Sequence, residues 1–455
     1  MRRVRNPESA PATSRTAIGW FTAGCVLVSN IIGGGIFTTT GILARDLGDP
    51  PTILLLWLLG ALFAVGGAMV YGEMGSLLPH AGGDYVYLRE AYGPLTAFLS
   101  GWTSFTIGFG AAVAASAISF SSYALRLVPL HDAGGWVADA LALSLLWIAT
   151  LVHCRGVQAG GRFQLFLTTT KTLAIGGLIL GGLAAVSARD PAPVVGASAD
   201  KATLGSLASS LVIVTYCYLG WNVTGYIAGE IANARRTLPR VMIGGTLFVG
   251  AIYLLLNIVY LSALSVQELA QEPIIPVAEK AATALWGPQG GQVVALVLCL
   301  SIAGAVSAMT WAGPRVYWTM AQDGILSSWL AELDSVSRVP VRAILLQSAW
   351  ASFLILTGTF ERLLLYSGIV LSLFTALTLS SLFRLRAVVP AHPDGYRAPF
   401  FPLLPALLVL AASGIAFSAA VQRPGEALLG GLTVLAGIPL YLYLKRRMPP
   451  GEPPP

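Results

Sequence analysis

The chain has 455 residues, of which 55% are hydrophobic and only 11% are charged. Soluble globular proteins carry about 25% charged residues, so this chain has too few charges to cover a water-exposed surface. The composition excludes a soluble enzyme, a secreted disulfide scaffold and a disordered protein, and it leaves an integral membrane protein. In such a protein a net charge of +6 is typical of basic cytoplasmic loops rather than of nucleic-acid binding.

Apolar runs that are almost free of charge recur along the whole chain. A helix crosses a hydrocarbon core of about 30 Å in about 20 residues. The runs are continuous rather than alternating, which favours helices over a β-barrel. We therefore predict an all-α integral membrane protein with twelve transmembrane helices, at about 17–43, 52–77, 95–125, 135–153, 163–187, 203–228, 240–265, 289–314, 343–360, 362–383, 401–422 and 426–444.

The basic residues are distributed unevenly between alternate loops. With the N-terminus inside, 19 of the 27 Lys and Arg residues fall on the cytoplasmic side, 7 fall outside, and Lys171 is intramembrane. This bias predicts a multi-pass protein of the cell (inner or plasma) membrane with both termini cytoplasmic. The expected parts are an N-terminal tail at 1–15, a transmembrane domain at 16–445 and a C-terminal tail at 446–455.

Glycine-containing breaks interrupt two of the predicted helices. Gly33, Gly34 and Gly35 lie in the middle of the first span, and Gly220 and Asn222 lie in the middle of the sixth. Unsatisfied backbone is not tolerated in lipid, so such breaks must line a protein-enclosed cavity. Glycines that serve only close helix packing are the alternative.

The position of the two breaks predicts an internal symmetry. Breaks in spans one and six match two five-helix halves in an inverted repeat, in which the breaks form the binding site of a transporter. The repeats are expected at about 16–187 and about 203–386, followed by two extra helices at about 401–444.

A broken helix presents both kinds of backbone group to a ligand. Free N–H groups at the start of its second half, at the positive end of the helix dipole, favour a carboxylate. Free carbonyls at the end of its first half favour an ammonium group. An α-amino acid carries both charges close together, which makes it a suitable ligand.

The sequence resembles the amino acid–polyamine–organocation (APC) superfamily over nearly its whole length, and especially its L-type amino acid transporter branch. The resemblance implies the five-plus-five inverted-repeat (LeuT-type) fold, with discontinuous helices 1 and 6, two further C-terminal helices and alternating access. The segments that carry it, in chain order, are NIIGGGIF at 30–37, YGEMG at 71–75 with GGDYVYLREAYGP at 82–94, YCYLGWN at 216–222, EIANARRTLPR at 230–240, RVYWTMAQDGILSSWL at 315–330 and YRAPFFPLLP at 396–405.

The resemblance also implies a set of substrate contacts. The N–H groups of Gly34 and Gly35 would hold the carboxylate, and the carbonyls of Ile31 and Tyr216 would hold the amino group. The Tyr216 ring matches an aromatic residue that closes over the substrate, and Asn222 matches a polar residue of the sixth-helix break. The predicted substrate-binding residues are Ile31, Gly33, Gly34, Gly35, Tyr216, Cys217, Leu219 and Asn222.

Three departures from the family pattern change these expectations. Gly34 replaces a serine, which removes a hydroxyl contact. Leu219 replaces a glycine beside the side-chain pocket, which is expected to make that pocket smaller. The loop near Pro129–Trp136 has no cysteine. Animal members use a cysteine there to bond a helper glycoprotein, so no disulfide-linked helper subunit is expected.

Lys171 is the basic residue that lies well inside a predicted span. A charged lysine at this depth costs several kcal/mol, so it must face the protein interior or a cavity. Family relatives carry a fifth-helix lysine where sodium sits in sodium-coupled cousins, which implies sodium independence. Either Lys171 exchanges a proton during transport, or it is a structural strut, which stays charged and supports the broken first helix by bonding to its carbonyls. Ser307 is expected to face the site next to Lys171, with helix packing as the alternative.

Other polar residues give weaker signals. Glu73 and Glu230 lie near predicted cytoplasmic helix ends, and we expect structural ion pairs there, for Glu73 with a cationic loop residue and for Glu230 with Arg235 or Arg236. An inner-gate role is the alternative. The spacing of histidines, cysteines and acids predicts no metal, no cofactor and no enzymatic site.

The sequence thus favours a secondary transporter of neutral α-amino acids, by exchange or proton coupling. A polyamine or basic amine carrier would need acidic residues in the pocket, and the spans hold acids only near their cytoplasmic ends. A non-transporting amino acid sensor would be expected to carry a sizeable output domain. No nucleic-acid partner is expected.

Overall fold

A computed structural model describes residues 17–127, 135–188, 203–271, 276–358 and 360–446. The predicted N-terminal tail, residues 129–134 of the third extramembrane loop and residues 447–455 lie outside the described residues. Within the described ranges the chain is helical and has no strand, apart from one isolated parallel bridge between Ile18 and Ile231. The prediction of an all-α protein is confirmed.

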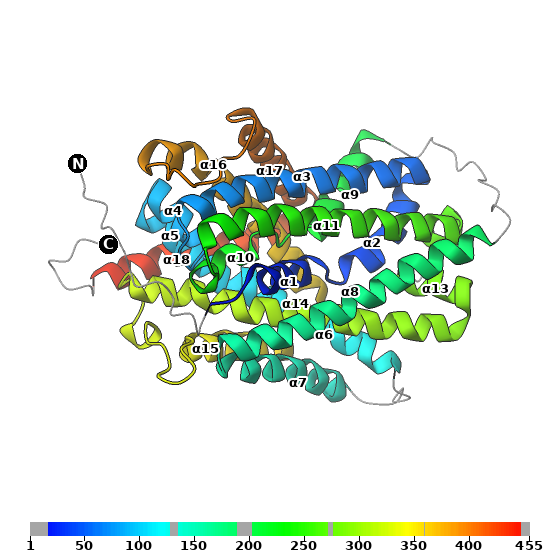
Figure 1. Ribbon diagram of the computed structural model, residues 1–455, viewed down its shortest axis with the longest axis horizontal. Helices are drawn as coiled ribbons and strands as arrows, with labels where there is room; N and C mark the ends of the chain where they lie inside the picture. The colour runs from blue at the N-terminus through cyan, green and yellow to red at the C-terminus, as the bar shows by residue number, and fades with distance from the viewer. Residues whose placement is uncertain (1–16, 128–134, 189–202, 272–275, 359, 447–455) are drawn as a thin grey trace.

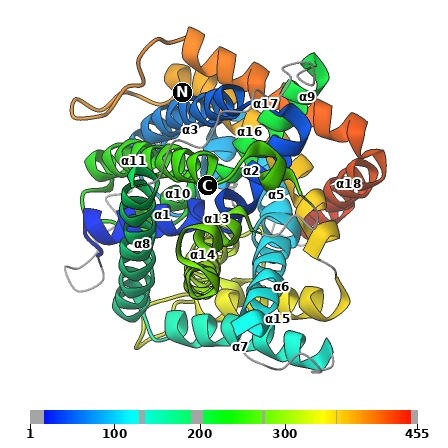
Figure 2. The ribbon, with the colours of Figure 1, turned by 90° about the vertical axis from the view of Figure 1, so that its right-hand side faces the viewer.

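Most of the long helices lie along the long axis of the molecule (Figure 1). Seen along that axis, α7, α17 and α18 lie at the edge of the bundle, and α2 and α14 lie nearer its centre (Figure 2). The helices are α1 Trp20–Ile31, α2 Gly35–Leu47, α3 Pro50–Leu77, α4 Asp84–Tyr92, α5 Pro94–Thr103, the π-helix η1 Ser104–Phe109, α6 Gly110–Leu127, α7 Gly135–Cys154, α8 Val157–Ser187, α9 Leu204–Cys217, α10 Val223–Tyr226, the 3-10 helix η3 Ala228–Glu230, α11 Ala234–Ala263, α12 Val266–Ala270, α13 Val277–Trp286, α14 Pro288–Gln322, the 3-10 helix η4 Ser328–Leu330, α15 Val341–Thr357, α16 Phe360–Val388, α17 Leu403–Gln422 and α18 Pro424–Arg446.

Ten helical segments of the described chain are long and apolar enough to cross a membrane. Each coincides with a predicted run, and the other two runs correspond to the shorter apolar helices Gly205–Cys217 and Val341–Thr357. The eighth run was expected to end at residue 314, but α14 continues to Gln322. The charge of Arg315 suggested an end there, whereas the folded chain buries this arginine in an ion pair with Glu230.

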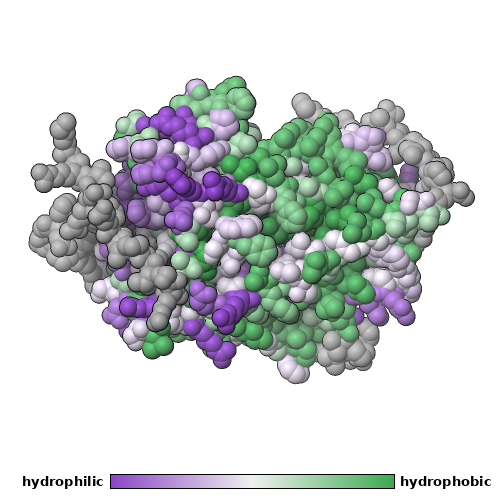
Figure 3. Space-filling model, viewed as in Figure 1, coloured by the Kyte–Doolittle hydropathy of each residue, from purple (hydrophilic) through white to green (hydrophobic). Residues whose placement is uncertain are grey.

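The surface of the bundle is apolar where a soluble protein would be charged. Large exposed side chains include Leu173 and Leu180 on α8, Leu247 and Phe248 on α11 and Leu62 on α3. In Figure 3 hydrophobic residues cover much of this face, and hydrophilic residues gather toward the end at which α4 lies. A surface of this kind is suited to lipid, so the chain is a multi-pass membrane protein.

Helix ends near the site follow local rules. The Asp49 side chain accepts a hydrogen bond of 2.9 Å from the Thr52 N–H and caps α3, which begins with two prolines. α2 ends at Gly48, whose φ of 73° is left-handed. These caps set the turn between α2 and α3. The broken helix itself is enclosed, since α1 packs against α8, α11 and α14, and α2 packs against α9, α12 and α13.

Candidate substrate site

The first helix break separates α1 from α2. Gly33 and Gly34 lie between the two helices, and α2 begins at Gly35. Among the described residues no backbone carbonyl accepts from the Gly34 N–H. The first N–H groups of a helix have no partner within it, so the Gly35 N–H is also available. A β-carbon built on Gly33 or Gly34 would meet no atom within 4 Å, so both glycines face open space.

The carbonyls on the other side of this break already have a cationic partner. Lys171 is completely buried on α8. Its ammonium group donates hydrogen bonds of 3.1 Å to the Ser29 carbonyl and 2.9 Å to the Ile32 carbonyl. This is the contact that the strut interpretation expects, because the lysine satisfies two acceptors that the broken helix leaves unpaired.

The two carbonyls predicted to hold the amino group are also engaged. The Ile31 carbonyl accepts from the Tyr253 hydroxyl at 2.9 Å and from the Gly33 N–H at 2.9 Å. The Tyr216 carbonyl accepts from the Leu219 N–H at 3.1 Å. Because a carbonyl oxygen has two lone pairs, an ammonium group at Ile31 would have to displace or share one of these donors.

The second break separates α9 from the single turn of α10. Gly220 lies within it with a φ of 119°, a conformation that side chains rarely adopt. A β-carbon on Gly220 would lie 2.5 Å from the Asn30 side-chain nitrogen. That nitrogen donates to the Gly220 carbonyl at 3.2 Å. Glycine is therefore required here both by the backbone and by the close approach of the first break.

One cavity of about 480 Å³ joins the two breaks. It is also lined by small and aromatic residues of α6, among them Ala112, Ser116 and Tyr123. The structure brings together around it all eight predicted substrate-binding residues, namely Ile31, Gly33, Gly34, Gly35, Tyr216, Cys217, Leu219 and Asn222. Its size lies within the usual range for small-molecule sites.

Next to the second break, backbone pairing and an ion pair join the start of α1, the 3-10 helix η3 and α14. The Ile18 N–H donates to the Glu230 carbonyl at 2.8 Å, and the Ala232 N–H donates to the Ile18 carbonyl at 3.0 Å. The Glu230 carboxylate lies 2.7 Å from the Arg315 guanidinium and accepts from the Trp311 indole at 2.7 Å. In the other direction the cavity lining reaches Tyr123, one turn from Arg126 at the end of α6.

Comparison with known proteins shows to which protein family this chain belongs. A family model described as amino acid permease matches residues 18–430. The chain belongs to the amino acid permease family. This permease is similar to the serine/threonine exchanger SteT of Bacillus subtilis (strain 168), with 28% identity over 94% of this chain and 97% of that protein.

Animal transporters are similar over the same region. The human large neutral amino acids transporter small subunit 2 is 27% identical over 93% of this chain and 79% of that protein. The mouse Asc-type amino acid transporter 1 is 26% identical over 93% of this chain and 80% of that protein. The family and these relatives are transporters rather than enzymes, which confirms the predicted class and the resemblance to the APC superfamily.

Both glutamates of the permease pair with arginines of distant helices, and Glu73 lies 2.7 Å from Arg386 of α16 rather than beside a loop residue. Glu230 binds Arg315 of α14 instead of Arg235 or Arg236. The Arg235 guanidinium donates to the Ser76 carbonyl at 3.0 Å, and Arg236 pairs with Asp394 at 2.8 Å. Nearness in the sequence suggested the local partners, but the bundle brings a buried arginine from another helix closer.

The Ser307 hydroxyl is not hydrogen-bonded to Lys171. It lies 2.9 Å from the His153 ring nitrogen, so its bond links α14 to α7. The α14 residue that approaches the lysine is Gly304, where an added β-carbon would lie 3.4 Å from the Lys171 nitrogen. A bond of this kind is the one that the helix-packing alternative expects, since the helix turns Gly304 toward α8 and Ser307 toward α7.

The sequence analysis assigned no role to three residues that contact the two breaks. Asn30 belongs to the first motif, but only the fold shows its bond to the second break. The Tyr253 hydroxyl lies near carbonyls of both breaks, 2.9 Å from Ile31 and 3.2 Å from Cys217. Tyr253 lies in an unbroken apolar helix, where no sequence motif indicates that it contacts the site. Asp84 of the GGDYVYLREAYGP segment is the third.

Asp84 is a buried carboxylate at the start of α4, outside the spans. One of its oxygens accepts a hydrogen bond of 3.5 Å from Asn222, and the other has no partner among the described residues. Burial raises the pKa of Asp84 to about 6, although the polar side chains of Tyr226, Asn222 and Tyr71 beside it act to lower it. Asp84 thus adjoins the second break at Asn222 and has no cationic partner among the residues that the structure describes.

Proposed function

We propose that the chain is a secondary active transporter that carries neutral α-amino acids across the cell membrane by alternating access. The observation that carries the proposal is the cavity between the two breaks, into which Gly33 and Gly34 present backbone without side chains. The Gly34 and Gly35 N–H groups would bind the carboxylate. The amino group would compete with Tyr253 for the Ile31 carbonyl.

The charge of the cavity favours a neutral substrate. Its lining contains no acidic and no basic side chain among the described residues. A polyamine or a basic amino acid would lose hydration in this cavity without gaining an acidic partner. The names of the similar proteins, which include a serine/threonine exchanger and a large neutral amino acids transporter, point in the same direction.

The proposed architecture has twelve spans, with the two halves of a LeuT-type inverted repeat at about 16–187 and 203–386. Both termini would be cytoplasmic. The predicted cytoplasmic basic residues include Arg235, Arg236 and Arg315, which lie next to Glu230 in the chain or bind it. The cavity would then open outward, and Glu230 with Arg315 would form part of an inner gate.

The coupling mode follows from the first break. Because Lys171 binds two helix carbonyls, we propose that it is a fixed strut in the place of a cation and that transport is sodium-independent exchange. Proton coupling through Lys171 is the alternative. We further propose that no disulfide-linked helper subunit is needed, because the loop near Pro129–Trp136 has no cysteine.

Uptake of a labelled amino acid mixture into proteoliposomes tests the proposal. The vesicles are run with and without internal amino acids, with and without an inward proton gradient, and with sodium replaced by choline. Uptake that needs internal amino acid and ignores both cations supports exchange. Uptake into empty vesicles that follows the proton gradient, and is lost in Lys171→Ala, would instead make Lys171 the proton carrier. Absence of uptake under every condition would overturn transport and favour a sensor.

A further inference from the structure

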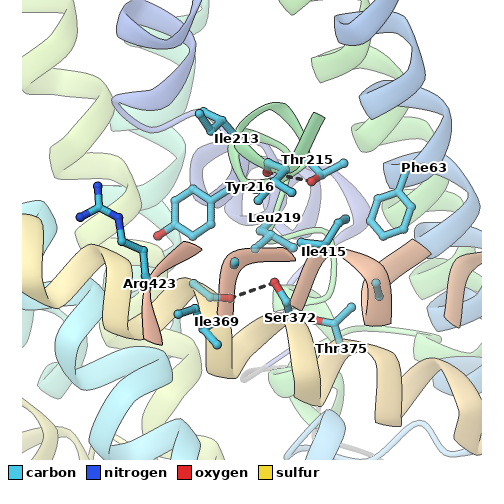
Figure 4. A pocket seen from close by; sticks show the side chains of 14 residues that line it. Phe63, Ile213, Thr215, Tyr216, Leu219, Ile369, Ser372, Thr375, Ile415 and Arg423 are labelled. Carbon is cyan, nitrogen blue, oxygen red and sulfur yellow. Dashed lines mark hydrogen bonds between the residues drawn. The ribbon is translucent and has the colours of Figure 1, made fainter. Parts of the chain in front are cut away.

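A second cavity lies behind the proposed substrate cavity. Its volume is about 190 Å³, and residues of α3, α9, α16 and α17 line it. Figure 4 shows Tyr216 and Leu219 on one side of this space, Ile369 and Ser372 below them, and Ile415 between. We call this space the back cavity.

Four residues line both cavities and therefore form the wall between them. They are Ile213 and Tyr216 on α9, Leu219 at the second break, and Thr375 on α16. Ile213 and Tyr216 are held within α9, and Tyr216 is further packed against Gly368, where an added β-carbon would lie 3.4 Å from its ring. Leu219 differs from the other three wall residues, because it lies in the irregular segment between α9 and α10 rather than in a helix.

The back cavity is suited to an apolar group. Phe63, Val212, Ile369, Ala412 and Ile415 give it an almost entirely apolar lining. Two of its polar side chains are satisfied within their own helices, and Arg423, the residue after α17, also lines the cavity. The Ser372 hydroxyl donates to the Gly368 carbonyl at 2.8 Å, and the Thr215 hydroxyl donates to the Leu211 carbonyl at 2.9 Å. An aliphatic or aromatic side chain that enters beside Ile369 and Ile415 would therefore meet mainly apolar groups.

We propose that Leu219 is a specificity-determining residue, whose side chain closes the back cavity to the substrate and so limits the size of the amino acid side chains that this permease accepts. The inference rests on the proposed function, since it needs an amino acid between the two breaks. Shortening Leu219 would join the cavities and let a larger apolar side chain enter the back cavity.

The test compares Leu219→Ala with the unchanged chain in proteoliposomes. Alanine keeps the β-carbon and hence the backbone preference at the break, which glycine would not. Uptake of labelled alanine, leucine and phenylalanine is measured separately. We expect the ratio of leucine or phenylalanine uptake to alanine uptake to rise by about tenfold or more, because one or a few methylene groups in an apolar pocket change selectivity by about 10–200-fold.

Two further variants separate the back cavity from a general loosening of the site. Ile415→Ala enlarges the back cavity without opening the wall, so selectivity should stay unchanged. Ala412→Leu in the Leu219→Ala background fills the back cavity again, so the gain should disappear. Thermal stabilisation of each purified variant by leucine and by alanine gives a binding readout if a variant no longer transports.

The possible outcomes decide between the claims. A wild-type chain that transports alanine and a Leu219→Ala variant with an unchanged selectivity ratio would overturn the role of Leu219 and leave the proposed function intact. A gain that persists after Ala412→Leu would overturn the back cavity as the space occupied. Failure of the wild-type chain to bind or transport any amino acid would overturn the proposed function and this inference with it.

Discussion

The two helix breaks differ in how completely the protein fills them. At the first break Gly33 and Gly34 face open space, and the Gly34 N–H has no backbone acceptor among the described residues. At the second break Asn30 contacts Gly220 at 3.2 Å, and the Tyr253 hydroxyl lies 3.2 Å from the Cys217 carbonyl. The first break thus leaves donors available to an anion, whereas the second is supported by neighbouring side chains.

This difference shows that a glycine in a broken helix can serve two purposes. At Gly34 the absence of a side chain exposes backbone to a ligand. At Gly35 and Gly220 it allows one break to approach the other, because β-carbons there would lie 2.7 Å from the Cys217 sulfur and 2.5 Å from the Asn30 nitrogen. Variants that separate exposure from packing therefore test the comparison.

The largest effect is expected from Lys171→Ala. It would leave the buried Ser29 and Ile32 carbonyls without their donor. Hydrogen bonds to charged groups contribute about 1.5–3 kcal/mol each, so we expect exchange to fall by about 100-fold or more. Lys171→Gln keeps a donor without the charge and should retain part of the exchange measured in proteoliposomes. Equal loss in both variants would show that the charge, rather than the hydrogen bonds, matters.

A smaller loss is expected from Gly35→Ala, because the new methyl group would collide with the Cys217 sulfur. Overpacking a buried site costs about 1–3 kcal/mol, which predicts a lower melting temperature and about tenfold slower exchange. Gly34→Ala is the matched control and should keep its melting temperature, since its methyl group would meet nothing within 4 Å. The double variant Gly35→Ala, Cys217→Ala removes the sulfur and should restore stability. A double variant as unstable as the single one would contradict the packing role of Gly35.

Removal of the hydroxyl that links both breaks tests their connection. In Tyr253→Phe the Ile31 and Cys217 carbonyls lose a shared donor, at a cost of about 1 kcal/mol. Exchange should fall by several-fold. Tyr260→Phe on the same helix removes a buried hydroxyl that has no partner among the described residues, so it should change little. Similar losses in the two variants would show that removing any buried hydroxyl from α11 slows exchange, and would contradict a specific role of the Tyr253 bonds.

The smallest effect on transport is expected from Asp84→Asn, which instead changes the pH dependence of stability. Because burial raises the pKa of Asp84 from 3.8 to about 6, the folded chain binds this proton more tightly than the unfolded chain. The stabilising contribution of the protonated carboxyl is complete below pH about 4 and is lost as the pH rises through about 6. The melting temperature should therefore fall by a few degrees between about pH 4 and pH 6.5 in the unchanged chain, and less so in Asp84→Asn.

The control for this titration is Glu90→Gln, which removes a carboxylate from the same helix. Glu90 is exposed to solvent and pairs with Arg89, so its variant should keep the pH dependence of the unchanged chain. The same pH profile in Asp84→Asn as in the unchanged chain would contradict the assignment of the titration to Asp84.

The sequence by itself determined the helical class, the positions of the membrane-crossing runs and the existence of both breaks. These features are local, because continuous apolar residues favour a membrane helix and glycine weakens it wherever the chain goes. The motif at 30–37 also placed Ile31, Gly34 and Gly35 at the break, and their grouping with Tyr216 and Asn222 followed from the resemblance.

Only the tertiary structure decided which side chains serve the breaks. Tyr253 and Asn30 act across more than 180 residues of chain, and Glu230 pairs with Arg315 rather than with Arg235 close by. The back cavity behind Leu219 likewise exists only where α3, α9, α16 and α17 meet. Hydrogen bonds and packing depend on distance and direction in space, and helix crossing sets both, so no run of neighbouring residues could have specified them.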